Sequence, residues 1–223
     1  MFAVLLPTVL TDWWGFFIRM GTMDKVAVFL DYENVHRTGH QMFAKIGEPL
    51  YGTVVNPLAI AEKLISKRKN GGMLHSVHVF RGRPVPYYQP KPASANDIQA
   101  AAWAEDSRVS VHRRDLKYDV AEDKSFVARE KGIDVALAVG LAEGALGRDF
   151  EVAIVFSCDT DLLPALEMVF RRKLAHLELG CWTGSKPLWF PEFLKATPPR
   201  NLPYCHFLNE TDFRDVRDFS AAT

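Results

Sequence analysis

Short apolar runs recur along the chain, and they constrain its fold more than any other feature of the sequence. The five runs are residues 26–30 (VAVFL), 74–80 (LHSVHVF), 109–112 (VSVH), 151–156 (EVAIVF) and 174–179 (LAHLEL). A continuous apolar run of this length is typical of a strand that is buried on both faces of a parallel sheet. We therefore expect these runs to form the strands of a central sheet.

Segments with helical signals separate the apolar runs. They predict helices over residues 56–69, 94–105, 132–146 and 161–172. The clearest start is at Asn56-Pro57, where a capping residue precedes a proline at the first helical position. Strands that alternate with helices of about 10–15 residues indicate a parallel sheet with helices on both faces. The predicted fold class is therefore α/β, a three-layer α/β/α sandwich with a central, mostly parallel, Rossmann-like sheet.

The net charge of zero hides an uneven distribution of charge. The chain has 223 residues, with 27 Lys and Arg against 27 Asp and Glu, and its 48% hydrophobic residues are typical of a globular protein. Residues 61–91 carry seven basic residues and one acidic residue, whereas residues 132–170 carry seven acidic residues and one basic residue. The neutral total excludes a polycation that coats nucleic acid non-specifically, but the segregated charges are compatible with a nucleic-acid enzyme.

The spacing of cysteine and histidine argues against several other kinds of site. Cys158, Cys181 and Cys205 are too far apart for a CxxC metal motif, and their odd number argues against a disulfide framework. We therefore expect a reducing, cytoplasmic setting. The seven histidines form no convincing zinc site, and the sequence has neither a glycine-rich phosphate-binding loop nor a G-x-S-x-G motif.

The first 22 residues are apolar but are interrupted by Pro7, Thr11 and Asp12. They lack the basic start and the cleavage site of a signal peptide, and no stretch reaches the roughly 18 residues that a membrane-spanning helix needs. Because Met23 resembles a natural start, this segment is either an upstream-start artefact or a packed or partner-binding extension. The expected organisation is an apolar N-terminal extension, a main domain and a C-terminal extension that packs on it, over residues 1–22, 23–183 and 184–223.

Acidic residues follow the predicted strands at the edge where ligands bind in open parallel sheets. Asp31 and Asn34 follow the first run, Asp159 and Asp161 follow residues 151–156, and Asp134 begins the helix that leads into that run. A single aspartate after a strand is often only a helix cap or a turn former. Four carboxylates at one edge repel one another unless cations neutralise them, and oxygen ligands suit Mg²⁺ or Mn²⁺.

These motifs together resemble the NYN branch of the PIN-like nuclease superfamily. The order and spacing of three elements agree over residues 24–181. The matching elements are D-x-x-N (Asp31, Asn34), K-G-[VI]-D (Lys131, Gly132, Ile133, Asp134) and S-x-D-x-D-[FL]-x-P (Ser157, Asp159, Asp161, Leu162, Pro164).

The resemblance implies a PIN-like fold and a ribonuclease that depends on Mg²⁺ or Mn²⁺. It makes Asn34 the polar partner at the first strand and Ser157 the residue that orients the acidic turn. The catalytic set that it implies is Asp31, Asn34, Asp134, Asp159 and Asp161, of which the four aspartates are the metal-site residues.

Three positions depart from the pattern of the NYN branch. Cys158 replaces the usual glycine, and Thr160 stands where a small residue is common. A buried inert thiol is the commoner role for such a cysteine, the alternatives being a tightened turn or redox sensitivity. Gly140 stands where many relatives carry an aspartate, and if that position supports the metal site, the enzyme is slower or binds a second metal more weakly.

Basic residues near the same edge are expected to hold RNA phosphates. Arg81 and Arg83 directly follow one predicted strand, Arg113 and Arg114 follow the next, with Lys117 beyond them, and Lys131 precedes Asp134. Lys67, Arg68 and Lys69 are instead expected to complement the dipole of a helix C-terminus. The full set predicted to contact nucleic acid is Ser157, Lys131, Arg81, Arg83, Arg113 and Arg114.

Two loops are expected between the regular elements. Residues 84–92 (PVPYYQPKP) form an extended loop stiffened by prolines, and residues 118–124 form a polar loop. Tyr87 and Tyr88 in the first loop either stack on unpaired bases or pack within the protein.

The leading hypothesis is a metal-dependent endoribonuclease that acts on single-stranded or loop regions of RNA, without a membrane partner and with a homodimer as one expected assembly. The alternative is a non-catalytic RNA-binding or regulatory protein that retains the fold, which Gly140 favours and the four aspartates disfavour. An aspartate-based phosphatase ranks last, because Glu33 and Val35 stand where its D-x-D-x-T motif requires aspartate and threonine.

Overall fold

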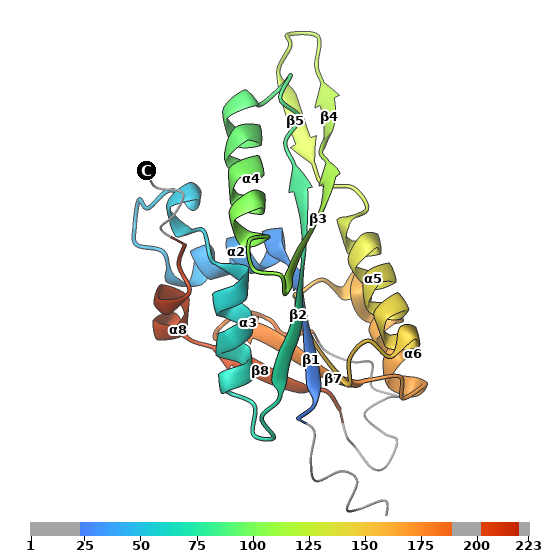
Figure 1. Cartoon of the computed structure of the whole chain (residues 1–223). Helices are drawn as coiled ribbons and strands as arrows, with labels where there is room; N and C mark the ends of the chain where they lie inside the picture. Colours follow the sequence, from blue (N-terminus) through green and yellow to red (C-terminus); the bar gives the residue numbers. More distant parts are fainter. Residues whose placement is uncertain (1–22, 189–201, 219–223) are drawn as a thin grey trace, which may run out of the picture.

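A six-stranded parallel sheet forms the middle layer of the molecule, and helices cover both of its faces (Figure 1). The computed structural model describes residues 23–188 and 202–218. The predicted three-layer α/β/α fold is thereby confirmed. In the order of the sheet, the strands are β3 (Val109–Asp115), β2 (Met73–Arg83), β1 (Lys25–Asp31), β6 (Val152–Phe156), β7 (His176–Trp182) and β8 (Tyr204–Leu208).

Each face of the sheet has its own apolar core. On one face lie α2 (Tyr32–Phe43), α3 (Pro57–Ser66), α4 (Pro90–Trp103) and α8 (Glu210–Asp215), and on the other lie α5 (Ile133–Gly147) and α6 (Leu163–Arg171) (Figure 1). Two short 3₁₀ turns, η1 (Leu50–Thr53) and η2 (Thr160–Leu162), complete this set. In β1, Val28 and Leu30 enter the first core while Ala27 and Phe29 enter the second. The strand is buried on both faces, as its unbroken apolar run predicts.

The direction in which strands are added reverses between β1 and β6. The chain runs from β1 to β2 and β3 on one side, then returns to β6 and continues to β7 and β8 on the other. Leu30 of β1 lies opposite Phe156 of β6, so the residues that follow, Asp31 and Ser157, leave the sheet side by side. Such a reversal opens a crevice at the carboxyl ends of the strands, which is where ligands bind in open α/β sheets.

Helix α2 runs continuously through Gly39, although glycine in a helix interior is destabilising. The glycine is needed for packing: a Cβ atom at Gly39 would lie 2.8 Å from Phe213 Cε2 and 3.0 Å from Trp182 Nε1. The Trp182 indole also donates a hydrogen bond of 2.8 Å to the Val35 carbonyl of the same helix. Tertiary contacts therefore decide this segment, and they fix the helix that carries Asn34.

The two predicted loops are wrong in part. Pro90 and Pro92 lie in the first turn of α4, where the missing N–H would have no helical partner in any case. The expected polar loop at residues 118–124 is a β-hairpin of two antiparallel strands, β4 (Lys117–Val120) and β5 (Phe126–Arg129).

Strand β2 also continues further than predicted, so Arg81 and Arg83 lie inside the strand rather than after it. Its last three residues pair with β3, from Arg81 opposite Arg113 to Arg83 opposite Asp115. Together with the hairpin and the start of α4, these strand ends form an arm, residues 81–97 and 113–131, that projects beyond the end of β1 (Figure 1).

The C-terminal extension predicted for residues 184–223 contributes β8 to the sheet and α8 to one helical layer. Residues 1–22, 189–201 and 219–223 lie outside the described residues, and so does the predicted apolar N-terminal extension.

A buried ionic cluster joins α3 to the far half of the sheet. Arg68 follows α3, and its guanidinium donates to the Glu178 carboxylate of β7 at 2.8–3.0 Å. His206 of β8 lies 2.6 Å from the same carboxylate. We expected Arg68 to complement the dipole of a helix C-terminus; it does follow α3, but its guanidinium is buried in this ion pair. Burial alone would raise the pKa of Glu178, but hydrogen bonds from His206 and Arg68 outweigh it and hold the pKa at about 2.

We expect Glu178→Gln to lower the free energy of unfolding by about 3–5 kcal/mol at pH 7, because it removes the buried counter-charge of Arg68 and leaves it only the half-exposed Asp24 at 4.0 Å. Because the folded pKa of Glu178 lies below its ordinary value of 4.5, its contribution is complete above that pH and is lost as the pH falls towards 2. Urea denaturation across this range measures both effects. The control Glu167→Gln, in the more exposed pair with Arg171, should change stability by less than about 1 kcal/mol. Equal losses in the two variants would contradict this account.

Candidate active site

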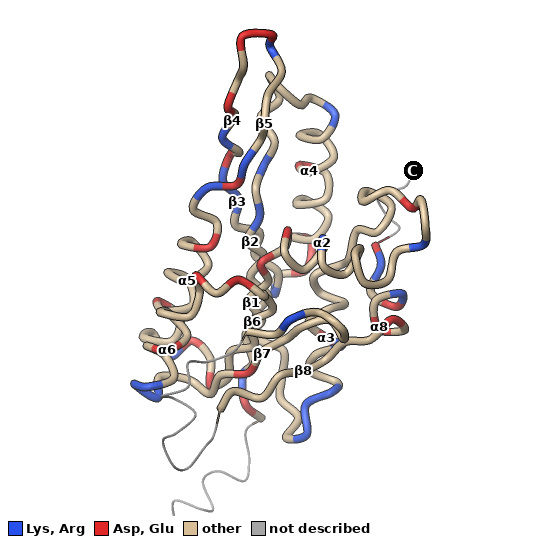
Figure 2. Tube along the Cα trace, turned by 180° about the vertical axis from the view of Figure 1, so that it is seen from behind, with Lys and Arg blue, Asp and Glu red and all other residues tan. Residues whose placement is uncertain are grey.

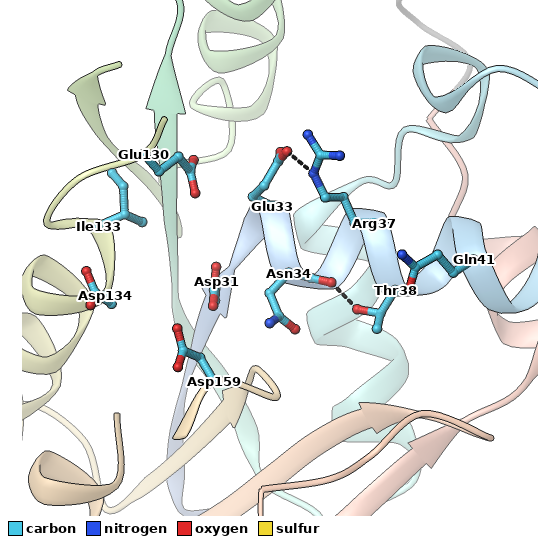
Figure 3. A pocket seen from close by; sticks show the side chains of 10 residues that line it. All are labelled: Asp31, Glu33, Asn34, Arg37, Thr38, Gln41, Glu130, Ile133, Asp134 and Asp159. Carbon is cyan, nitrogen blue, oxygen red and sulfur yellow. Dashed lines mark hydrogen bonds and ion pairs between the residues drawn. The ribbon is translucent and has the colours of Figure 1, made fainter. Parts of the chain in front are cut away.

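A pocket of about 470 Å³ opens at the point where the strand order reverses. Figure 3 shows its lining, in which Asp31 ends β1, Asp134 lies in the first turn of α5 and Asp159 follows β6. Asn34, from the first turn of α2, lies beside them. The full lining is Asp31, Glu33, Asn34, Arg37, Thr38, Gln41, Glu130, Ile133, Asp134 and Asp159.

Asp31 is the most buried carboxylate of the pocket, with 8% of its surface exposed. The Ser157 hydroxyl donates a hydrogen bond of 2.8 Å to Asp31 Oδ2. Burial raises the pKa of Asp31 to about 6, against the opposing effect of hydrogen bonds from Ser157 and the Asn34 backbone. The charges of Asp159 and Glu33 raise the pKa further. A buried, crowded carboxylate of this kind is typical of a functional site.

Ser157 connects Asp31 to the turn that carries Asp159. While its hydroxyl donates to Asp31, its oxygen accepts a hydrogen bond of 3.0 Å from the Asp159 backbone N–H. The next peptide, Cys158 N–H, donates to the Asn34 side-chain oxygen at 3.1 Å. The ends of β1, β6 and α2 are thus fixed to one another by short polar contacts.

Asp161 is not part of the pocket lining. Its side chain is exposed, and its backbone N–H donates to Asp159 Oδ1 at 2.9 Å. The fold therefore brings together Asp31, Asn34, Asp134 and Asp159 of the predicted catalytic set, and it leaves Asp161 on the outer side of the turn.

Two carboxylates in the pocket were missed by the sequence motifs. Glu33 lies inside the D-x-x-N segment and forms an ion pair with Arg37. Glu130 directly precedes the K-G-I-D motif, and its carboxylate accepts a hydrogen bond of 2.5 Å from the Gly82 N–H of β2. A Cβ atom at Gly82 would lie only 2.7 Å from Glu130 Oε1, so this approach requires glycine. Partial burial of the carboxylate and the charges of Glu33 and Asp31 raise the pKa of Glu130 to about 7, against the opposing effect of the hydrogen bond from Gly82.

The donor set of the pocket suits a hard divalent cation. Five carboxylates face a single guanidinium, that of Arg37, and oxygen atoms dominate the polar lining. Within the described residues, however, no three Asp, Glu, His or Cys side chains already converge on one metal position. The chemistry therefore fits an ion of the Mg²⁺ type, which is held by one or two carboxylates and keeps several of its waters.

Three of the arginines predicted to bind RNA have partners within the protein. Arg81 packs over the rings of Tyr32 and Trp103, at 4.8 and 5.1 Å from their centroids. Arg83 and Arg113 both form ion pairs with Asp97, at 2.8 and 2.5 Å. Because these contacts occupy their guanidinium groups, the three arginines stabilise the fold, and their charges are less available to RNA phosphates.

Arg114 and Lys131 remain available near the pocket. Both side chains are exposed, and neither forms a hydrogen bond or ion pair within the described part of the chain. The guanidinium of Arg114 lies against Gly132, which precedes α5 and has a positive φ of 75°. These two cations therefore flank the acidic pocket at the start of α5.

The structure also bears on the roles that the sequence left open for Tyr87, Tyr88, Cys158 and Gly140. Tyr88 stacks on Tyr118 with ring centroids 4.2 Å apart, so it is a packing residue, whereas Tyr87 is 86% exposed. Cys158 is half-buried, and burial raises the pKa of its thiol. Gly140 lines a separate groove beside Phe80, and it does not contribute to the acidic pocket.

The match to a known family agrees with this geometry. The model of the NYN domain matches residues 25–180, which include Asp31, Asn34, Asp134 and Asp159. The chain belongs to the NYN domain family. NYN domains form a branch of the PIN-like nucleases, so the pocket lies in a nuclease-type domain.

One solved structure similar to this NYN chain is that of a Vibrio parahaemolyticus protein of unknown function. The two are 15% identical with a TM-score of 0.49, and the match covers 85% of this chain and 94% of that one. No curated protein sequence matches the chain significantly. Among the helices of the described residues, none is both long enough and apolar enough to cross a membrane.

We expect Ser157→Ala to lower the free energy of unfolding by about 1–3 kcal/mol, because it removes a hydrogen bond from the buried Asp31 and leaves the Asp159 N–H unpaired. Chemical denaturation measures the loss. The control Ser125→Ala removes a side-chain hydrogen bond of 2.6 Å, to Asp123, on the exposed hairpin, and should change stability by less than about 0.5 kcal/mol. A Ser157→Ala protein as stable as the control would show that this contact does not fix the turn.

Proposed function

We propose that this NYN domain is a Mg²⁺- or Mn²⁺-dependent endoribonuclease that hydrolyses phosphodiester bonds in single-stranded or loop regions of RNA. One observation carries the proposal: Asp31, Asp134 and Asp159, from three separate motifs, line one pocket at the reversal of strand order. Membership of the NYN family supports a nuclease-type hydrolase. The substrate, the metal and the roles of individual residues are the parts that we add.

The metal would be held by the carboxylates of Asp31 and Asp159, with Asp134 across the pocket. Asp161 lies on the same turn as Asp159 but outside the pocket lining. Bound in the pocket, a divalent cation supplies a more acidic water and neutralises charge on the phosphate. Hydrolysis forms one phosphorus–oxygen bond to the water oxygen and breaks the bond to a ribose oxygen, which takes up a proton.

The residues around the carboxylates position the reaction. Ser157 holds Asp31 in one orientation through its hydrogen bond, and the Cys158 N–H holds the side-chain oxygen of Asn34. With that oxygen occupied, the Asn34 amide nitrogen is the group left to donate to a phosphate oxygen. Lys131 and Arg114 beside the pocket supply positive charge for the neighbouring phosphates.

We expect Asp31→Asn and Asp159→Asn each to reduce RNA cleavage by at least about 100-fold, because loss of a metal-site carboxylate should cost at least as much as loss of an outer-shell partner. Cleavage of a mixture of single-stranded and structured RNA in Mn²⁺ measures the effect. The control Asp149→Asn removes an exposed carboxylate outside the pocket and should keep full activity. Undiminished, metal-dependent cleavage by both site variants would contradict the assignment.

Removal of the metal gives an independent test. We expect EDTA to stop cleavage by the unmodified protein and added Mn²⁺ or Mg²⁺ to restore it, without a change in the far-ultraviolet circular dichroism spectrum. Cleavage that continues in EDTA would rule out the proposed mechanism.

A non-catalytic RNA-binding protein is the second candidate. The observation in its favour is that no three metal-ligating side chains converge within the described residues. This candidate expects RNA binding that weakens steeply with salt but no cleavage in either metal. The endoribonuclease proposal expects both binding and cleavage, so the same RNA assay decides between them.

A further inference from the structure

The β4–β5 hairpin is fixed to the other half of the arm, residues 81–97, by an aromatic contact and two hydrogen bonds. Tyr118 of β4 stacks on Tyr88, and the Phe126 ring packs against both. The Tyr118 hydroxyl donates to the Gln89 side chain at 2.8 Å and accepts from the Val85 N–H at 3.0 Å. The inner face of the hairpin is therefore occupied by packing, and its outer face points away from these rings.

The outer face of the hairpin carries two cations, Lys117 and Arg129, with one carboxylate partner, Asp119, between them. Lys117 and Arg129 lie directly opposite each other in the antiparallel pair, and like charges in this position destabilise a hairpin. Asp119 forms an exposed ion pair of 3.1 Å with Arg129, but within residues 23–188 and 202–218 Lys117 has no ion pair or hydrogen bond. Such an arrangement becomes favourable when an anion lies across the two strands.

This cationic face is continuous with the candidate active site. Arg129 ends β5, the next residue, Glu130, lines the pocket, and Lys131 follows it. Arg114, without an ion pair in the described part of the chain, lies against Gly132 at the start of α5. Figure 2 shows blue segments at the base of the hairpin next to the red segments around β1 and α2, whereas the tip of the hairpin is acidic.

We propose that the outer face of the hairpin base, formed by Lys117 and Arg129 and continued by Arg114 and Lys131, binds the sugar–phosphate backbone of RNA outside the pocket. The identity of the ligand rests on the proposed endoribonuclease function. Lys117, Arg114 and Lys131 have no ion pair or hydrogen bond within the described residues, and Arg129 has one exposed ion pair, with Asp119, so these cations are available for phosphate. Phosphate contacts fix the register of a bound strand without reading its sequence. The pocket then acts on a bond whose flanking nucleotides are held by the arm.

The direct test is the salt dependence of binding to a single-stranded oligouridylate in EDTA, where cleavage does not interfere. The double variant Lys117→Gln with Arg129→Gln should bind more weakly, and the slope of log affinity against log salt should fall by about 1.4, or about 0.7 for each lost phosphate contact. The control, Lys69→Gln with Arg172→Gln, removes two exposed cations away from the arm and should leave the slope unchanged.

An unchanged slope in the hairpin variant, or an equal change in the control, would overturn the proposal. So would the absence of any oligouridylate binding by the unmodified protein at low salt. Because this measurement needs no cleavage, it decides the role of the arm even if the protein cleaves no RNA and the proposed function fails.

If the protein is active, the kinetics provide a second readout. The hairpin variant should raise KM for a long RNA severalfold with little change in kcat, and should hydrolyse bis(p-nitrophenyl) phosphate, which is too small to reach the arm, at the normal rate. Loss of activity on both substrates would instead indicate damage to the pocket, which contradicts a role confined to binding the flanking RNA.

Discussion

The parallel pairing of β1 with β6 is the constraint on which the candidate site depends. Both strands are buried on both faces, so their register is fixed by two apolar cores, and their ends emerge side by side. The Ser157 hydroxyl then joins the two ends through Asp31 and the Asp159 N–H. A buried carboxylate with a raised pKa is costly by itself, and it persists here because the surrounding core fixes the backbone that carries it.

The fold and three of the four aspartates could be predicted from the sequence because local patterns determine them. Unbroken apolar runs specify strands in a parallel sheet, and residues at the ends of neighbouring strands meet without further information. Helix α2 and Glu130 could not be predicted in this way. Gly39 becomes helical through its contact with Trp182, and Glu130 reaches the pocket only because a hairpin and the bare Gly82 backbone place it there.

The ion-pair partners of the arginines could not be predicted from the sequence either. The sequence predicts a basic segment near the acidic edge, but it does not reveal that Arg68 pairs with a buried glutamate or that Arg83 and Arg113 share Asp97. When the arginines with these internal partners are set aside, the cations that remain near the pocket are Lys117 and Arg129 at the hairpin base and Arg114 and Lys131 at the start of α5. The net charge of zero is thus the sum of an acidic pocket and an adjacent basic surface, on which Arg129 alone of the four cations has an ion pair among the described residues.

The central claim is that the acidic pocket of this NYN domain holds a divalent metal ion. The most direct measurement is the anomalous diffraction of crystals grown with Mn²⁺. We predict a peak inside the pocket, within about 2.0–2.3 Å of a carboxylate oxygen of Asp31 or Asp159, with waters completing the coordination. A well-ordered pocket without such a peak, at a Mn²⁺ concentration that supports cleavage, would contradict the account.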